Sequence, residues 1–377
     1  PWSGGTPLVW RLGDVMNSKP IIVGEASGNY HLLYDDATFN DYRLEVARRR
    51  QVAYFGSNDG FLHAINLGYF GSLSDGQAGF TKVDHNGLGT AHELGDELWA
   101  YVPTSVLPHL AWMADPDYDH GYYVDLKPYI VDVKDERGAK PVWRTLLIGG
   151  LRLGGRTINM ADDLSPDDSH SEFFALDITD PDSEPKLMWR FSHQNLGLST
   201  AVPTVVRGKG GAWYVVLPSG PTSDVMDSSG RMAPQPSVGE TNSAYEGRSE
   251  QRARVFVIDA LTGRLVNTPA ADPDDDKLVV KEENSFFSDT FTPRSVYVQK
   301  TGSDVTWSNH TVYMGLTSRD IDKDTGAVYR LKMADDNGEP LEVEKWELKR
   351  LIKTDKPVTG AVNSAYDQLG NSWVVFG

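Results

Sequence analysis

Short apolar runs dominate the pattern of hydrophobic and polar positions along the chain. Five of them are rich in β-branched or aromatic residues, and most end on glycine: residues 52–56, 145–149, 213–217, 312–315 and 373–377. Runs of this length and composition, closed by a turn residue, are typical of buried β-strands. A strand of alternating polarity, as expected of a half-buried antiparallel strand, follows each run except the last: residues 60–66, 173–177, 254–259 and 326–331.

These strands belong to a larger repeated unit. A third segment, which carries a tryptophan, follows in three of the cycles at residues 97–101, 186–191 and 344–348. A further strand precedes each run, usually with a proline or a small residue at its start, at residues 18–23, 127–131, 201–206 and 292–298, and residues 357–362 begin a fifth cycle. Four antiparallel strands per cycle predict the blades of a β-propeller. A β-sandwich with irregular insertions is the alternative.

Long polar loops separate the cycles. Successive cycles lie 75 to 108 residues apart, measured from one strand-starting proline to the next, whereas compact propeller repeats span roughly 40 to 50 residues. The surplus lies in loops rich in Gly, Ser, Asp and Pro at residues 67–96, 152–172, 218–253 and 267–290. Helix is predicted only at residues 41–50 and 104–113. We therefore expect an all-β protein, a modified β-propeller with long loop insertions and few short helices.

Composition and charge remove several functional classes. The 377 residues contain no cysteine, and 36 basic against 53 acidic residues give a net charge of −17. Nucleic-acid-binding proteins need a basic surface, so this charge argues against one. Without cysteine there is no disulfide scaffold, no cysteine-ligated metal and no thiol catalysis. No apolar run reaches the roughly 18 to 20 residues of a membrane helix, so we expect no membrane insertion.

Both ends of the sequence suggest a fragment of a longer protein. The chain begins at Pro1 without an initiator methionine or a signal-peptide pattern. It stops at Gly377, inside a segment that is predicted to be a strand. We therefore interpret residues 1–377 as a single β-propeller domain that is incomplete.

Several stretches resemble one known family. Residues 52–66, VAYFGSNDGFLHAIN, are similar to a quinoprotein-type propeller blade. In order along the chain, further stretches resemble the C-terminal domain of PilC/PilY-type proteins of type IV pili: residues 12–20, 94–110, 116–118, 122–128, 148–155, 175–181 and 218–221. The resemblance implies a propeller of quinoprotein-like, four-stranded blades at the end of a larger secreted protein, whose N-terminal adhesin region is absent here.

The resemblance also implies a function. Family members are exported through the periplasm to the cell surface and the pilus tip, where they assist pilus assembly, support extension against retraction and mediate attachment. The expected partners are the minor pilin and other pilus-tip subunits, the pilus fibre, and a host or abiotic surface. No enzymatic activity is expected. Calcium commonly tunes the behaviour of the family.

The calcium expectation points to one loop. Family members often carry alternating Asp or Asn residues beside a blade strand, and the best match here is Asp320, Asp322 and Asp324. Alternate carboxylates in a tight loop can converge on Ca²⁺, which takes about six to eight oxygen ligands. The loop departs from the usual pattern, because Lys323 adds a positive charge and Leu331 stands where a bidentate Glu is common. A solvated acidic turn is therefore the alternative, and the acidic loops 115–119 and 272–276 are weaker candidates.

Two other functions remain as alternatives. A quinone-cofactor-dependent oxidoreductase uses the same type of blade, but it needs an adjacent cysteine pair, and we expect no set of tryptophans to stack on such a cofactor. No nucleophile elbow or phosphate-binding loop is present, and His63 is interpreted as a packed strand residue. A periplasmic scaffold propeller is the second alternative, although it would lack the long insertions. The basic run Arg48 to Arg50 is interpreted as surface charge.

Overall fold

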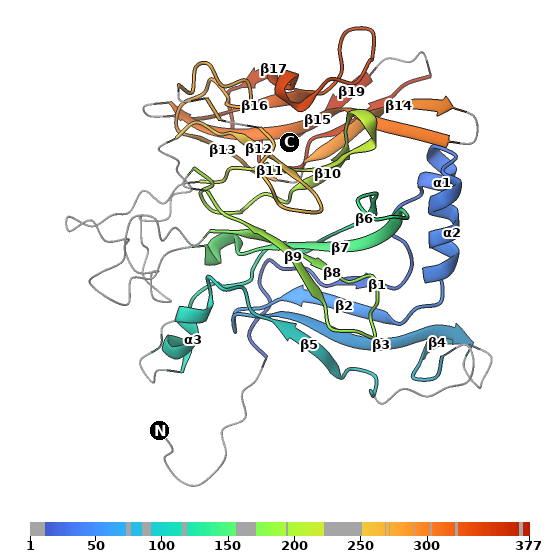
Figure 1. Cartoon of the computed structure of the whole chain (residues 1–377). Helices are drawn as coiled ribbons and strands as arrows, with labels where there is room; N and C mark the ends of the chain where they lie inside the picture. The colour runs from blue at the N-terminus through green and yellow to red at the C-terminus, as the bar shows by residue number, and fades with distance from the viewer. Residues whose placement is uncertain are drawn as a thin grey trace.

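The computed structural model describes residues 12–72, 77–84, 92–114, 118, 120–155, 171–193, 195–221, 251–267, 269–270, 272–289, 291–301, 304–320, 323–368 and 372–377. These residues form successive antiparallel sheets that follow one another in chain order, as the colours of Figure 1 show from blue to red. The prediction of an all-β propeller is confirmed.

The first two sheets are complete blades. Blade 1 contains β1 (Ile21–Val23), β2 (Gln51–Gly56), β3 (Leu62–Ser72) and β5 (Glu97–Tyr101), and β4 (Ala78–Thr81) pairs with the far end of β3. Blade 2 contains β6 (Tyr129–Asp135), β7 (Val142–Gly150), β8 (Phe173–Asp177) and β9 (Lys186–Phe191). The central strand β7 is almost continuously buried because neighbouring blades cover both of its faces.

The remaining sheets repeat the plan less regularly. Blade 3 has three described strands, β10 (Thr204–Arg207), β11 (Trp213–Pro218) and β12 (Val255–Asp259). Blade 4 contains β13 (Ser285–Phe287), β14 (Thr292–Thr301), β15 (Asp304–Asp320), β16 (Lys323–Lys332) and β17 (Glu347–Thr354). A two-stranded sheet of β18 (Asn363–Tyr366) and β19 (Ser372–Val375) follows it. Within the described ranges, 3₁₀ turns lie at Arg152–Gly154, Lys209–Gly211 and Val343–Lys345.

The hydrophobic core lies between consecutive blades. One cluster joins Tyr54 of blade 1 to Phe174 of blade 2, and a second joins Phe191 of blade 2 to Phe256 of blade 3. A third cluster joins blades 3 and 4 and includes Trp346, which is 1% exposed. Face-to-face packing of successive sheets is how a propeller buries its apolar strands.

Two helices extend across the ends of several blades. Helices α1 (Tyr30–Leu33) and α2 (Ala37–Val46) are inserted between β1 and β2, and Figure 1 shows them running from the level of blade 1 to the end of β14. Asp36 caps α2 by accepting hydrogen bonds from the backbone of Thr38 and Phe39, as is common at a helix N-terminus. A third helix, α3 (Leu107–Met113), lies on the opposite side of the sheets.

Some predicted elements differ from the structure. The predicted fifth-cycle strand at residues 357–362 is not a strand, and β18 begins at Asn363 instead. The segments predicted as loops contain β4 and β13, and the helix predicted at residues 41–50 lies at residues 37–46. Trp143, Trp189, Trp213 and Trp346 are buried in the core, whereas Trp373 is 60% exposed.

Candidate binding groove between helix α2 and blade 2

A groove of about 760 Å³ lies between helix α2 and two loops of blade 2. The helix contributes Thr38, Asp41, Tyr42, Glu45 and Val46, and Arg49 follows just beyond its end. This spacing of three and four residues places these side chains on one face of the helix. Blade 2 contributes Lys134, the segment 141–143 before and within β7, and the segment 179–182 after β8. We call this feature the α2 groove.

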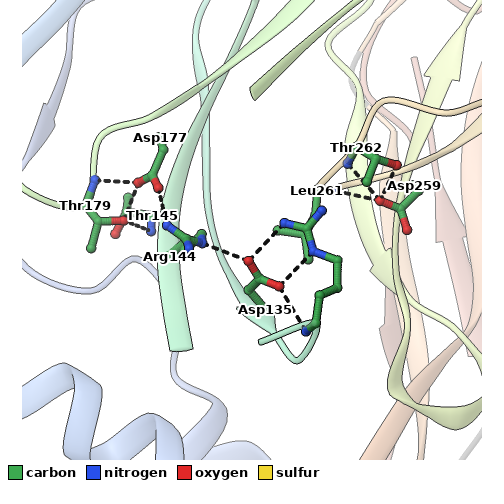
Figure 2. Close-up of polar contacts among 9 residues, drawn as sticks. Asp135, Arg144, Thr145, Asp177, Thr179, Asp259, Leu261 and Thr262 are labelled. Atoms are coloured by element: carbon green, nitrogen blue, oxygen red, sulfur yellow. Dashed lines mark hydrogen bonds and ion pairs between the residues drawn. The ribbon is translucent and has the colours of Figure 1, made fainter. Parts of the chain in front are cut away.

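The first loop wall of the α2 groove is the β6–β7 hairpin, which an arginine pair holds in shape. Asp135 accepts hydrogen bonds from Arg137 Nε at 2.8 Å and Nη2 at 2.9 Å, and from Arg144 Nε at 3.1 Å (Figure 2). Hydrogen bonds from Arg137, aided by those from Arg144, hold the pKa of the Asp135 carboxyl well below its usual range. Asp135 is therefore ionised at neutral pH, and the hairpin is fixed to β7.

The second loop wall follows β8 and is fixed to the same arginine. Arg144 Nη1 donates to Asp177 Oδ2 at 2.7 Å (Figure 2). The other oxygen of Asp177 accepts the backbone N–H and the hydroxyl of Thr179, at 3.0 and 2.5 Å. Thr145 N also donates to Thr179 Oγ1 at 3.0 Å. Arg144 thus connects three consecutive strands, and the loop that begins at Thr179 has a defined conformation.

The helix wall is bound to blade 2 through hydroxyl groups. Thr145 donates its hydroxyl proton to Asp132 at 2.8 Å, so Tyr42 must be the donor in its 2.5 Å contact with Thr145 Oγ1. Burial raises the pKa of Tyr42 to about 12, which keeps the phenol protonated. Trp143 Nε1 donates to Thr38 Oγ1 at 3.1 Å. The helix is therefore fixed to the blade along its length.

Two members of the basic run are structural. Arg49 donates to the carbonyls of Gly24 at 3.0 Å and Thr179 at 2.9 Å, so it joins blade 1 to blade 2. Arg50 is 3% exposed and pairs with Asp182 at 2.6 Å. The interpretation of this run as surface charge is therefore wrong for Arg49 and Arg50, because both guanidinium groups satisfy acceptors between packed elements. It is correct for Arg48, which is exposed.

The surface of the α2 groove combines carboxylates with apolar side chains. Asp41, Glu45, Asp180 and Asp182 are exposed at its rim. Val142 is 49% exposed, whereas Tyr42, Val46 and Trp143 form a buried floor beneath it. The only cations among the described lining residues are Arg49 and Lys134, and Lys134 lies 3.3 Å from Glu136. The groove therefore has an acidic rim and an apolar floor.

A turn in blade 3 repeats the arrangement seen after β8. Asp259 Oδ1 accepts the backbone N–H of Leu261 at 3.1 Å and of Thr262 at 2.8 Å (Figure 2). Asp177 and Asp259 each end the third strand of their blade, and each caps its turn with a nearby threonine. Such Asp–Thr pairs are the local signal from which these turns could have been predicted.

An aromatic cluster lies where the two helices meet the blade ends. Trp143, Trp213 and Trp307 come from three consecutive blades, and their neighbouring ring centroids are 6.0 and 5.3 Å apart. The ring of Tyr30, in α1, contacts all three tryptophan rings. Its centroid lies 4.9 Å from the ring centroid of Trp307. These three tryptophans therefore form one packed cluster. Because Tyr30 fills the space among them, this cluster does not fit a planar stacked cofactor.

Arg207 is buried against the same tryptophans. Its guanidinium carbon lies 5.5 Å from the ring centroid of Trp213 and 5.0 Å from that of Trp307. Arg207 Nε donates to the Gly211 carbonyl at 3.1 Å, and burial lowers the pKa of the side chain. Contacts of this kind compensate part of the cost of removing a cation from water.

A second polar cluster occupies the β2–β3 hairpin of blade 1. Ser57 Oγ lies 3.0 Å from His63 Nε2, and His63 Nδ1 lies 2.5 Å from Glu97 Oε1, which is the connectivity of a Ser-His-Glu triad. However, Ser57 donates its proton to Asp59, which also lies 3.2 Å from His63 Nε2.

Two further observations decide the role of this cluster. Burial lowers the pKa of His63, but hydrogen bonds to Asp59 and Glu97 outweigh it and raise the pKa overall. A raised pKa favours the protonated imidazole and so weakens His63 as a base, and Ser57 is only 1% exposed to solvent. The cluster thus fixes the hairpin, and Gly13 N donates to Asp59 at 3.0 Å to attach the N-terminal segment. His63 is the packed strand residue that was predicted.

Two of the three predicted calcium ligands lie in the paired strands β15 and β16. Asp320 ends β15, Asp324 is the second residue of β16, and Asp322 lies outside the described residues. The register pairs Asp320 with Lys323 and Asp324 with Arg319. Within the described ranges no group of three His, Asp or Glu side chains could hold a metal ion. Calcium binding at Asp320, Asp322 and Asp324 therefore stays a prediction.

The two acidic loops that were the weaker candidates for calcium binding give no further support for a site. In the loop 272–276, Asp274 pairs with Arg252 at 2.5 Å, and Arg252 also pairs with Glu283. Most of the loop 115–119 lies outside the described residues. Concerning membranes, none of the helices in the described segments is long and apolar enough to cross a bilayer.

Comparisons with known proteins identify the family. The family model of the PilY1 beta-propeller domain matches residues 12–234, more than half of the chain. A type IV pilus biogenesis factor PilY1 homolog of Xylella fastidiosa is 30% identical over 221 residues, which is 56% of this chain and 14% of that protein. The type IV pilus biogenesis factor PilY1 of Pseudomonas aeruginosa is 31% identical over 222 residues, 56% of this chain and 15% of that protein. The chain therefore spans about one seventh of the length of these relatives.

A solved structure shows the same fold. The crystal structure of the Pseudomonas aeruginosa PilY1 C-terminal domain is similar over 94% of this chain and 58% of that chain, with a TM-score of 0.54 and 20% sequence identity. At this identity the likeness concerns the fold alone. Together with the match of the family model, it agrees with the blade order described above. The chain belongs to the family of PilY1 beta-propeller domains.

Proposed function

We propose that this propeller is the binding and assembly module of a type IV pilus tip protein, with no chemistry of its own. The observation that carries the proposal is membership of the PilY1 beta-propeller family, whose relatives are named type IV pilus biogenesis factors. The α2 groove supports it, because the groove is a preformed concave surface with an apolar floor, as binding sites usually are.

The finer parts of the proposal concern place and partners. The parent protein is exported through the periplasm and acts at the pilus tip on the cell surface. There it supports pilus extension against retraction and attachment to a host or abiotic surface. Its partners are the minor pilins and other tip subunits, and the pilus fibre. These statements rest on the family relationship, and no residue of this chain is assigned to any one of these partners.

Calcium tuning is part of the proposal on weaker grounds. It rests on the alternation of Asp320, Asp322 and Asp324 in the sequence, the first of which ends β15 while the last lies in β16. A hairpin tip is reachable from solvent and could change the interactions of blade 4 when an ion binds. Titration with calcium tests this part separately from the pilus role.

The pilus role is tested in the organism that produces the protein. Cells whose parent protein lacks the propeller should carry fewer surface pili and attach less. Piliation should be restored when the retraction motor is also removed, because the proposed role opposes retraction. If pilus number and attachment were unchanged without the propeller, the proposal would be wrong.

A further inference from the structure

We propose that the α2 groove binds a cationic segment of a partner protein, with lysine or arginine side chains on both sides of an aliphatic residue. The inference rests on the proposed function, since it names the chemistry of the partner that a binding module would hold at this site. It follows from the charge, the exposed apolar surface and the rigidity of the groove, which are argued in turn.

The charge of the rim is not neutralised within the chain. Of its four carboxylates, Asp182 pairs with Arg50, whereas Asp41, Glu45 and Asp180 have no ion-pair partner among the described residues. The two cations of the groove are already engaged. Arg49 is directed at backbone carbonyls, and Lys134 lies beside Glu136. A basic side chain placed in the groove would therefore meet unpaired carboxylates at short range, where their attraction is strongest.

The apolar part of the groove favours an aliphatic side chain between the basic ones. Val142, at the start of β7, is 49% exposed beside Pro141, which is also exposed. The buried rings of Tyr42 and Trp143 lie in the floor below. An aliphatic side chain that covered Val142 would remove apolar surface from water on both partners, which is favourable in proportion to the area covered. An apolar centre with a charged rim is the usual plan of a protein interface.

The walls of the groove are rigid before any partner binds. Asp135, Arg144 and Asp177 join the two loop walls to the strands of blade 2 (Figure 2), and Tyr42 and Trp143 join the helix wall to the same blade. A preorganised site loses little conformational freedom on binding, so more of the contact energy appears as affinity. The acidic rim also repels anionic partners, which gives the groove selectivity by charge.

Fluorescence anisotropy with a short labelled peptide tests the proposal. The probe carries two lysines on either side of a leucine, and the comparison peptides replace the lysines by glutamates or the leucine by glycine. The whole 377-residue chain is titrated at low ionic strength, because salt screens interactions between exposed charges. The groove variant combines Asp41→Asn, Glu45→Gln and Asp180→Asn, which are exposed positions.

A matched variant controls for the general attraction between a cation and an acidic protein. It combines Asp275→Asn, Glu339→Gln and Glu344→Gln, which change the net charge equally at exposed positions of blades 3 and 4. The groove variant should bind the probe about tenfold more weakly, whereas the matched variant should change the affinity less than about twofold. The glycine peptide should bind the wild-type chain about fivefold more weakly than the leucine peptide.

Three results would overturn the inference: no binding of the lysine–leucine probe, equal losses in both triple variants, or stronger binding of the glutamate peptide. Each would leave the pilus role intact, because the piliation assay does not involve these substitutions. Conversely, unchanged piliation without the propeller would refute the pilus role while the groove kept its selectivity for the cationic peptide. The two failures are therefore distinguishable.

Discussion

Trp189 Nε1 donates to the carbonyl oxygen of Ala260 at 2.8 Å, and this hydrogen bond joins the outer strand of blade 2 to the turn that follows β12 in blade 3. The turn approaches the indole closely at Gly263, where an added Cβ would lie 2.4 Å from Trp189 Cβ. Gly263 also has a φ of +69°, which other residues adopt with strain. This contact between blades 2 and 3 therefore depends both on the hydrogen bond from the indole and on the absence of a side chain at Gly263.

Replacing Trp189 by phenylalanine should weaken this contact between blades but still fill much of the space that the indole occupies. The phenyl ring keeps part of the packing, but the buried Ala260 carbonyl loses its donor, which costs about 1–3 kcal/mol. Trp373→Phe is the control, because Trp373 is 60% exposed and its substitution should change stability by less than about 0.5 kcal/mol. Urea unfolding measures both. Equal effects of the two substitutions would show that the indole of Trp189 does not join the blades.

Asp135→Asn should lower stability in a pH-dependent way. Because the folded-state pKa of Asp135 lies below its unfolded value, the ionised carboxylate stabilises the protein above the ordinary pKa of about 4. That contribution is lost as the pH falls through the folded-state value. The difference in unfolding free energy between wild type and variant should therefore be largest near neutral pH and shrink towards pH 2. A difference that stayed constant over this range would contradict the assigned ion pairs.

Gly220 should not tolerate a side chain, because the backbone of Leu198 lies too close to it. At Gly220 an added Cβ would lie 1.6 Å from the Leu198 carbonyl oxygen, so Gly220→Ala should cost about 1–3 kcal/mol or more through overpacking. At Gly71 nothing lies within 4 Å of the same position, and Gly71→Ala should be nearly neutral. Thermal unfolding of both variants checks the pair. A neutral Gly220→Ala would mean that the backbone there is not held as described.

Calcium binding at the β15–β16 hairpin is testable by isothermal titration. If the aspartates bind the ion, the wild-type chain should release or absorb heat with Ca²⁺, and Asp322→Ala should abolish it. Asp275→Ala, in the other acidic loop, is the control and should leave the heat unchanged. Identical heats from wild type and Asp322→Ala, or no heat from either, would remove this hairpin as a metal site.

Much of the fold could be predicted from the sequence because blade strands carry local signals. The boundaries of β8 and β9 match the prediction to the residue, since each is a short segment marked by aromatic and aliphatic residues. The short strand β4 was missed because its exposed alternation, with Gly79 inside it, resembles a loop. Helix α1 has only four residues and no strong apolar periodicity, so it could not be predicted from the sequence.

The α2 groove could not be predicted from the sequence. Its walls come from segments near Asp41, Val142 and Asp180, which are far apart in the chain and meet only when blades 1 and 2 pack. Arg50 was interpreted as surface charge for the same reason, because its partner Asp182 is 132 residues away. Local turn motifs such as Asp177 with Thr179 could indicate where the loops lie, but not which loops face one another.

The capture of minor pilins by the purified propeller tests the central claim most directly. The 377-residue chain is immobilised, exposed to the purified minor pilins of the same organism, and washed at moderate ionic strength. The binding-module account predicts specific retention of at least one minor pilin. Retention should persist for the exposed control variant Trp373→Phe and fall for destabilised Gly220→Ala. No retention of any minor pilin by the folded chain would contradict the account.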